Sequence, residues 1–284
     1  MRIGITSPVV VQQPGVSSAW EADAGAGELA RIARAADQLG FHHLTCSEHV
    51  AVPVGVAHQR GGTYWDPLAT LGYLAACTSR IRLVTQVLVL GYHHPLQIAK
   101  RYGTLDALSG GRVTLGLGVG SLREEFALLD APFEDRGARA DDAARALRSA
   151  LSRRRPSYHG EYYAFEDLLV EPHAVQQRVP MWFGGRTPRS LRRAAAHGDG
   201  WVPFGLTPDE LRDMLRRTEL PDGFEIVLSP GRPVDPLGDP EATTRALIRT
   251  RETGATLLSA SVRADSADHY CEQLAALAPL AAHL

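Results

Sequence analysis

Residues 85–121 contain one complete strand–helix–strand unit, and this unit restricts the fold more than any other part of the chain. Residues 80–90 read RIRLVTQVLVL, an apolar, β-branched run typical of a strand buried on both faces of a parallel sheet. Pro95 can begin a helix, because the first helical position needs no N–H donor, and the SGG triplet at 109–111 can end it. A second apolar strand follows at 113–118. The unit predicts parallel strands joined by helices.

The same order of strand and helix recurs along the whole chain. Eight apolar strand patterns alternate with helical patterns, and eight strands close a (β/α)8 TIM barrel. We therefore expect an α/β fold with one barrel domain over residues 1–284. Residues 152–178 predict a short insertion before strand five, and residues 48–64 predict a long loop. In the helix that begins at Pro95, the apolar spacing predicts burial of Leu96, Ala99, Tyr102, Leu105 and Leu108.

Charge and composition argue against several kinds of partner. The net charge of −2 and a pI near 6.6 give no electrostatic reason to expect nucleic acid or an anionic membrane surface. No apolar run reaches membrane-spanning length, and strand pattern begins at Arg2, so we expect neither a membrane span nor a signal peptide. The three cysteines are far apart and form no paired motif, which favours a reducing, cytoplasmic location.

The first candidate site is the sequence GGRTP, which follows the fifth predicted strand. Gly184 and Gly185 allow the backbone to approach a ligand, and Thr187 is a suitable N-cap for a helix that begins at Pro188. The free N–H groups of that helix, together with the guanidinium of Arg186, predict an anion site. The alternative is an ordinary turn between a strand and a helix.

The second candidate is the glycine loop from Gly116 to Ser121, which ends the fourth predicted strand. Its GxGxG spacing is similar to a dinucleotide fingerprint. That motif, however, needs a third glycine in the following helix and a position in the first strand–turn–helix of the domain. The simpler interpretation is that the glycines relieve crowding where the barrel closes, unless a cofactor lies there.

The third candidate is the pair Glu48-His49, directly after the second predicted strand. A carboxylate near an imidazole can tune acid–base chemistry at neutral pH, although neighbouring side chains of an extended chain point in different directions. His94 follows another strand end and could line the same cavity. We expect no metal site, because residues 6–8 (TSP) offer no ligand after strand one.

Taken together, these motifs resemble those of the bacterial luciferase-like flavin and deazaflavin oxidoreductases, in particular the branch that uses coenzyme F420. The matching stretches are GFHHLTCSEHV (40–50), the run from SRIRL to DRGAR (79–139), YHGEYYAFED (158–167) and VPMWFGGRTPRSLRRAAAHGDGWVP (179–203). They cover most of residues 1–205, and the remainder matches in architecture alone.

The resemblance implies that a cofactor lies across the C-terminal ends of the barrel strands. Gln86-Val87 would carry the family's non-prolyl cis peptide bond behind the redox ring, and the turn after strand five would hold the cofactor phosphate. The residues implied in cofactor binding are Gln86, Val87, Gly120, Ser121, Gly184, Gly185, Arg186, Thr187, Pro203 and Phe204.

The resemblance also implies a reaction, the transfer of a hydride between the deazaflavin and a small organic substrate. His49, with Glu48 beside it, would donate a proton or stabilise charge, and Tyr64 and His94 would line the substrate pocket. Some members of the family have carboxylates after strands one and four. Here Thr6-Ser7 and Ser121 occupy those places, which argues against sugar-phosphate oxidation.

Two other functions remain open on the sequence alone. One is an FMN-dependent monooxygenase on the same barrel, and the other is a non-catalytic barrel that has lost its site. The glycine turns and Arg186 argue against the second function, because a purely structural barrel needs no exposed anion site. The resemblance further implies a homodimer.

Overall fold

Buried apolar runs form eight parallel strands, and these strands close into a barrel in the computed structural model, which describes residues 1–282. The order around the barrel is β1-β12-β11-β10-β9-β6-β5-β3, with β3 pairing back onto β1. The strands are β1 (Arg2–Ile5), β3 (His43–Cys46), β5 (Arg82–Val89), β6 (Val113–Gly118), β9 (Met181–Gly184), β10 (Gly200–Val202), β11 (Glu225–Leu228) and β12 (Leu257–Ala260). The predicted TIM barrel is confirmed.

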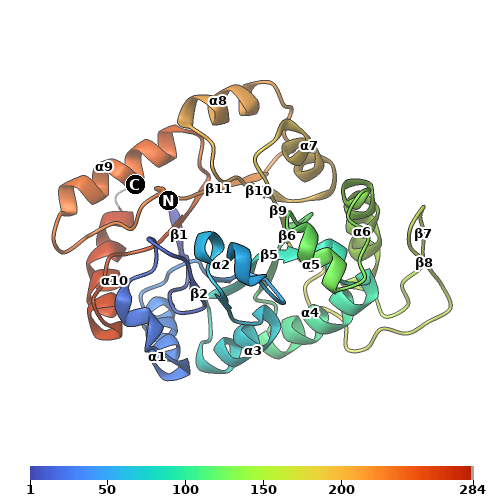
Figure 1. Cartoon of the computed structure of the whole chain (residues 1–284), viewed down its shortest axis with the longest axis horizontal. Helices are drawn as coiled ribbons and strands as arrows, with labels where there is room; N and C mark the ends of the chain where they lie inside the picture. The colour runs from blue at the N-terminus through green and yellow to red at the C-terminus, as the bar shows by residue number, and fades with distance from the viewer. Residues whose placement is uncertain (283–284) are drawn as a thin grey trace.

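Eight helices form a ring around the strands (Figure 1). They are α1 (Ala26–Gln38), α3 (Pro67–Cys77), α4 (Pro95–Ser109), α6 (Arg136–Ala150), α7 (Pro188–His197), α8 (Pro208–Arg216), α9 (Pro240–Glu252) and α10 (Ala267–Ala282). Five of these helices begin at a proline preceded by a polar N-cap residue, which fixes where each helix starts. None of the helices within residues 1–282 is both long enough and apolar enough to cross a lipid bilayer.

Several short helices and two-residue strands lie in the loops between the barrel strands and the outer helices. The helices α2 (Val54–Arg60) and α5 (Arg123–Leu128) lie inside the outline of the outer ring in Figure 1. Single 3-10 turns occur at Ala19–Ala22 and Leu90–Tyr92. The antiparallel pair β2 (Val11–Gln12) and β4 (Thr63–Tyr64) joins the loops that follow β1 and β3. The pair β7 (Tyr158–His159) and β8 (Ala164–Phe165) lies in the predicted insertion and projects from the barrel.

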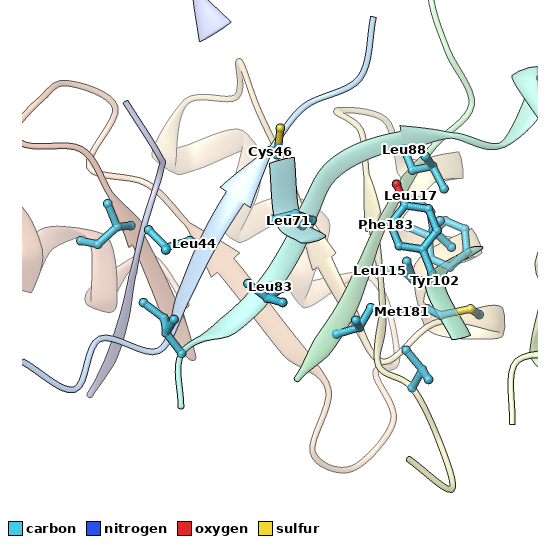
Figure 2. Close-up of a cluster of buried hydrophobic side chains, with 14 of the residues drawn as sticks. Leu44, Cys46, Leu71, Leu83, Leu88, Tyr102, Leu115, Leu117, Met181 and Phe183 are labelled. Atoms are coloured by element: carbon cyan, nitrogen blue, oxygen red, sulfur yellow. The ribbon is translucent and has the colours of Figure 1, made fainter. Parts of the chain in front are cut away.

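The core has two parts because side chains alternate between the two faces of each strand. The larger part fills the space between strands and helices, where Leu44, Leu83 and Leu115 pack with Leu71 of α3 and Tyr102 of α4 (Figure 2). The smaller part lies inside the barrel and consists of Val84, Trp182, Val202, Val227 and Leu257. A filled interior confines any ligand to the mouth of the barrel.

Two sequence-based expectations about the fold are wrong. Residues 48–64 were expected to form a loop, yet they contain α2 and β4. The helix α2 has no buried residue, so its sequence carries no apolar period that would reveal it. Leu108 was expected to be buried, but it is 78% exposed, because the last turn of α4 buries Leu105, Asp106 and Ser109 and leaves Leu108 on the outer side of the helix.

Candidate active site

His49 forms a pair with a buried carboxylate that lies 76 residues further along the chain. Its Nδ1 is 2.7 Å from Oε2 of Glu125, a residue of α5 with no exposed surface. An ionised carboxylate only accepts hydrogen bonds, so Nδ1 carries the proton and donates it. Nε2 of His49 has no hydrogen-bond partner among residues 1–282, and the side chain keeps 17% of its surface exposed. The pair therefore presents one free ring nitrogen.

Glu125 is held by four donors, which keeps its carboxylate ionised. Oε1 accepts hydrogen bonds from the N–H groups of Val50 (2.5 Å) and Ala51 (3.2 Å), and Oε2 also accepts one from the hydroxyl of Tyr92 (2.7 Å). Burial acts to raise the pKa of Glu125, but the hydrogen bonds from Tyr92, His49 and Val50 lower the pKa below its ordinary value. Burial and the bond to Glu125 raise the pKa of Tyr92, so its hydroxyl stays protonated.

Glu48 does not pair with its neighbour His49. Its Oε1 lies 2.7 Å from Nε2 of His93, and its Oε2 accepts a 2.7 Å hydrogen bond from the N–H of Val89. Both oxygens are thus occupied and the side chain is only 6% exposed. Glu48 therefore ties the end of β3 to the end of β5, and a catalytic part for it stays a prediction.

Of two further residues predicted for the site, Tyr64 packs against His49, and Ser121 is connected to Tyr64 through Arg60. The ring of Tyr64 meets that of His49 edge-on, with 4.5 Å between ring centroids. The hydroxyl of Tyr64 donates to the carbonyl of Arg60 (2.6 Å), and Arg60 in turn donates to the hydroxyl of Ser121 (3.3 Å). The end of α2 and the loop after β6 therefore meet beside the histidine.

His94 has a structural contact that sequence reasoning missed. Its Nδ1 accepts a hydrogen bond from the N–H of Leu96 (3.2 Å), which makes His94 the N-cap of α4. Burial lowers the pKa of His94, and the neutral ring keeps the lone pair that this cap needs. The ring lies edge-on to Tyr163. A place for His94 in the substrate pocket stays a prediction.

The glycines at the ends of β6 and β9 make room for other groups. A Cβ on Gly118 would lie 2.5 Å from Val87, and one on Gly184 would lie 2.9 Å from Val87. Gly120 has φ +77°, and a Cβ there would lie 2.5 Å from Phe126. The crowding interpretation of the glycine loop therefore holds at these positions. A cis peptide bond joins Gln86 to Val87, where the resemblance implied it.

The turn before α7 has fewer free N–H groups for binding an anion than the sequence predicts. The N–H of Ser190 donates to Oγ1 of Thr187 (3.2 Å), and the N–H of Thr187 donates to Oγ of Ser190 (3.1 Å). This capping box uses two of the N–H groups that we expected to be free, which corrects that expectation. The guanidinium of Arg186 is exposed and makes no hydrogen bond or ion pair with any residue in 1–282. Arg186 is therefore the main anion-binding group available at this turn.

Gln86, Pro203 and Phe204, all predicted to bind the cofactor, line one cleft of about 530 Å³ at the ends of β10 and β11. Phe204 is 62% exposed. The side-chain Oε1 of Gln86 is buried and lacks a hydrogen-bond partner in the described chain. An acceptor in this state needs a donor from a ligand or water. The cleft reaches from the ends of β10 and β11 to Gln86 of β5, and β5 pairs directly with β3, the strand that His49 follows.

Comparison with known proteins places this barrel in a family. Residues 1–220 match the sequence profile of the luciferase-like monooxygenase family. The chain belongs to this family. It is therefore an oxidoreductase.

Individual relatives differ in how much they share with the chain. An uncharacterised protein of Mycobacterium tuberculosis is 31% identical over 265 residues, which span 87% of this chain and 92% of that protein. The F420-dependent glucose-6-phosphate dehydrogenase of Kineococcus radiotolerans is 32% identical over 211 residues, 72% of this chain and 60% of that enzyme. The solved structure of the monooxygenase RslO1 from Streptomyces bottropensis superposes with a TM-score of 0.76 at 24% identity, covering 100% and 99% of the two chains.

Proposed function

We propose that the protein transfers a hydride between coenzyme F420 and a small organic substrate. The observation that carries the proposal is the presence of unpaired polar groups at the barrel mouth. His49 presents a free ring nitrogen after β3, Gln86 of the neighbouring strand β5 has a buried Oε1 without a partner among the described residues, and Arg186 after β9 offers an unpaired guanidinium. The F420-dependent dehydrogenase relative, at 32% identity, favours F420 over FMN as that ligand.

The residues at the mouth fit such a cofactor. Arg186 would hold its phosphate, since a guanidinium binds phosphate through two parallel hydrogen bonds. The buried Oε1 of Gln86 would accept a hydrogen bond from the polar edge of the ring. Phe204 and Pro203 would cover its apolar surface. When bound, the deazaflavin supplies or accepts the hydride and, in its reduced form, reacts poorly with oxygen.

The protein's own contribution is a positioned proton. Glu125 fixes the imidazole of His49 through Nδ1, so Nε2 can donate a proton to the substrate, or accept one from it, as the hydride moves. The edge-on ring of Tyr64 limits the rotation of the imidazole. Hydride and proton together make up the two-electron reduction or oxidation of a substrate bond.

The substrate in this proposal is not a sugar phosphate, although one relative is a glucose-6-phosphate dehydrogenase. Ser121 stands where the resemblance implies a carboxylate for that chemistry, and its hydroxyl already accepts a hydrogen bond from Arg60. We therefore favour a small alcohol, ketone or similar compound that binds between His49 and the cofactor ring.

The first experiment is a fluorescence titration of the purified protein with F420 and FMN side by side. Tighter binding of F420 supports the proposal and justifies a substrate screen with the reduced cofactor. Tighter binding of FMN, with oxygen consumption once a reductase is added, would instead indicate a flavin monooxygenase. Failure to bind either compound would leave the non-catalytic barrel as the better description.

We also propose that the protein is a cytoplasmic homodimer. All three cysteines are free thiols in the structure, which is compatible with a reducing compartment. The dimer rests on the family resemblance. Light scattering should give twice the 30.7 kDa mass of the chain. A single-chain mass at micromolar concentration would contradict the dimer.

A further inference from the structure

The cleft that begins at Gln86 continues between α8 and α9, where its lining changes from apolar to basic. Leu206 and Leu211 line it together with Arg212 of α8 and Arg249 of α9. Neither α8 nor α9 contributes to the pair of His49 and Glu125. This part of the cleft therefore has no task in the proton chemistry.

Three guanidinium groups lie around this cleft, and two of them have no charged partner among the described residues. The guanidinium of Arg186 comes within 3.8 Å of the place that a Cβ on Gly205, a cleft residue, would take. The guanidinium of Arg249, like that of Arg186, has no partner among the described residues. Arg212 pairs with Asp209 at 2.8 Å, but both side chains are exposed, so water competes for this pair.

Glu252 is the acidic residue among those that line the cleft, and it is exposed. Its single charge offsets part of the positive charge of Arg212 and Arg249. With Arg186 at the rim, the three arginines still outnumber the two carboxylates beside them, those of Glu252 and Asp209. The cleft therefore favours an anionic ligand.

We propose that Arg212 and Arg249 bind the carboxylates of the cofactor tail, beyond the phosphate that Arg186 would hold. The inference rests on the proposed function. The strands β9, β10 and β11 are neighbours in the barrel, so a ligand held at the turn after β9 continues naturally into a cleft after β10 and β11. Coenzyme F420 carries glutamate carboxylates beyond its phosphate. Guanidinium groups bind carboxylates through paired, charge-assisted hydrogen bonds.

A carboxylate on the substrate is the other possible source of the same charge. The position of the arginines argues against it, because Arg212 and Arg249 belong to α8 and α9, which follow β10 and β11, whereas His49 follows β3, at least three strands away around the barrel. The test separates these two sources by using cofactor alone.

The test compares the affinities of F420 and of the same deazaflavin without its glutamates, both measured by fluorescence titration. In the variant Arg212→Ala/Arg249→Ala, we expect F420 to bind about 10-fold more weakly and the truncated form to bind within about 2-fold of wild type. The affinity of wild type for F420 should fall more steeply with salt than that of the variant. Glu252→Gln should tighten F420 binding.

Arg245→Ala is the matched control, because Arg245 is an exposed arginine of α9 that pairs with Glu241 and does not line the cleft. It should change neither affinity. An unchanged F420 affinity in the double variant would overturn the inference, and so would equal weakening of both cofactor forms. Either result leaves the proposed function standing if wild type binds F420. Absence of F420 binding by wild type would instead remove the proposed function, and the inference with it.

Discussion

Nδ1 of His49 donates a 2.7 Å hydrogen bond to the buried carboxylate of Glu125. The histidine follows β3 and the glutamate belongs to α5, so the bond links two loops at the mouth of the barrel. Because the carboxylate is also held by Tyr92 and by two backbone N–H groups, it has little freedom to turn away. The orientation of the imidazole is thereby set before any ligand binds.

The first prediction concerns the tautomer of His49. In the neutral ring the proton should reside on Nδ1 and leave Nε2 bare, because the ionised carboxylate of Glu125 only accepts. Two-dimensional 1H–15N NMR of 15N-histidine-labelled protein distinguishes the two ring nitrogens. The spectrum of His49→Gln identifies the signal. Glu125→Gln should lose the Nδ1–H signature, whereas Tyr92→Phe should keep it. A ring with its proton on Nε2 would contradict the proposed role of the pair.

The second prediction concerns the cofactor phosphate. Arg186→Ala should weaken F420 binding by about 10- to 100-fold, the effect of losing one charge-assisted contact of about 1.5–3 kcal/mol. Arg189→Ala is the control, because the guanidinium of Arg189 lies next to Gly137 of α6 and not at the cleft. A fluorescence titration of each variant decides the matter. Unchanged affinity in Arg186→Ala would show that the phosphate lies elsewhere.

The fold was largely predictable because its signals are local. Each barrel strand is a short apolar run, and Pro188 with Thr187 before it marks the start of α7 at the observed residue. The helix α2 was missed because none of its residues is buried. The predicted burial of Leu108 was wrong because three-residue spacing from Leu105 does not fix how wide the buried face of a helix is, and Asp106 and Ser109 occupy that face instead.

The site was less predictable because its contacts join distant residues. Glu125 follows another glutamate in a short helix, and no local pattern tells which of the two turns inward to His49. The sequence also suggested free N–H groups before α7, whereas Ser190 completes a capping box with Thr187. The sequence does contain a signal for this capping box, because Thr187 and Ser190 have the three-residue spacing of such pairs.

The third prediction concerns acid stability and the other end of the barrel. His42 and His43 lie where β3 begins, with their Nδ1 atoms 3.1 Å apart. Burial, with Arg2 and Arg82 nearby, lowers the pKa of His42 from 6.5 to about 4. A folded-state pKa below the unfolded value means that the unfolded chain binds more protons between these limits. The stability that neutral His42 contributes is therefore fully present above pH 6.5 and is lost as the pH falls toward 4.

The protonation of His42 should lower the free energy of unfolding by on the order of 2–3 kcal/mol between these two pH values. Urea unfolding at a series of pH values measures it. His42→Gln should flatten the pH dependence, although the buried His43, whose pKa burial also lowers, will retain part of it. An equally steep curve in His42→Gln would show that other groups control acid stability.

The fourth prediction tests the close packing of β5 against β6 that positions Val87. A Cβ on Gly116 would lie 1.9 Å from the carbonyl oxygen of Thr85, a backbone atom of the neighbouring strand. Because β5 and β6 are paired on both sides of this point, neither backbone can move without breaking hydrogen bonds. Gly116→Ala should therefore lower the free energy of unfolding by about 2–3 kcal/mol.

Gly27→Ala provides the matched control for this substitution. Gly27 is an exposed residue of α1, and a Cβ there would meet no atom within 4 Å. Alanine favours a helix over glycine, so Gly27→Ala should raise the free energy of unfolding by about 0.5–1 kcal/mol. Urea unfolding of both variants at pH 7 gives the two values. The two substitutions should change the free energy of unfolding in opposite directions, because the added methyl group meets a backbone oxygen in the barrel but only solvent on α1. Changes of the same sign would contradict the prediction.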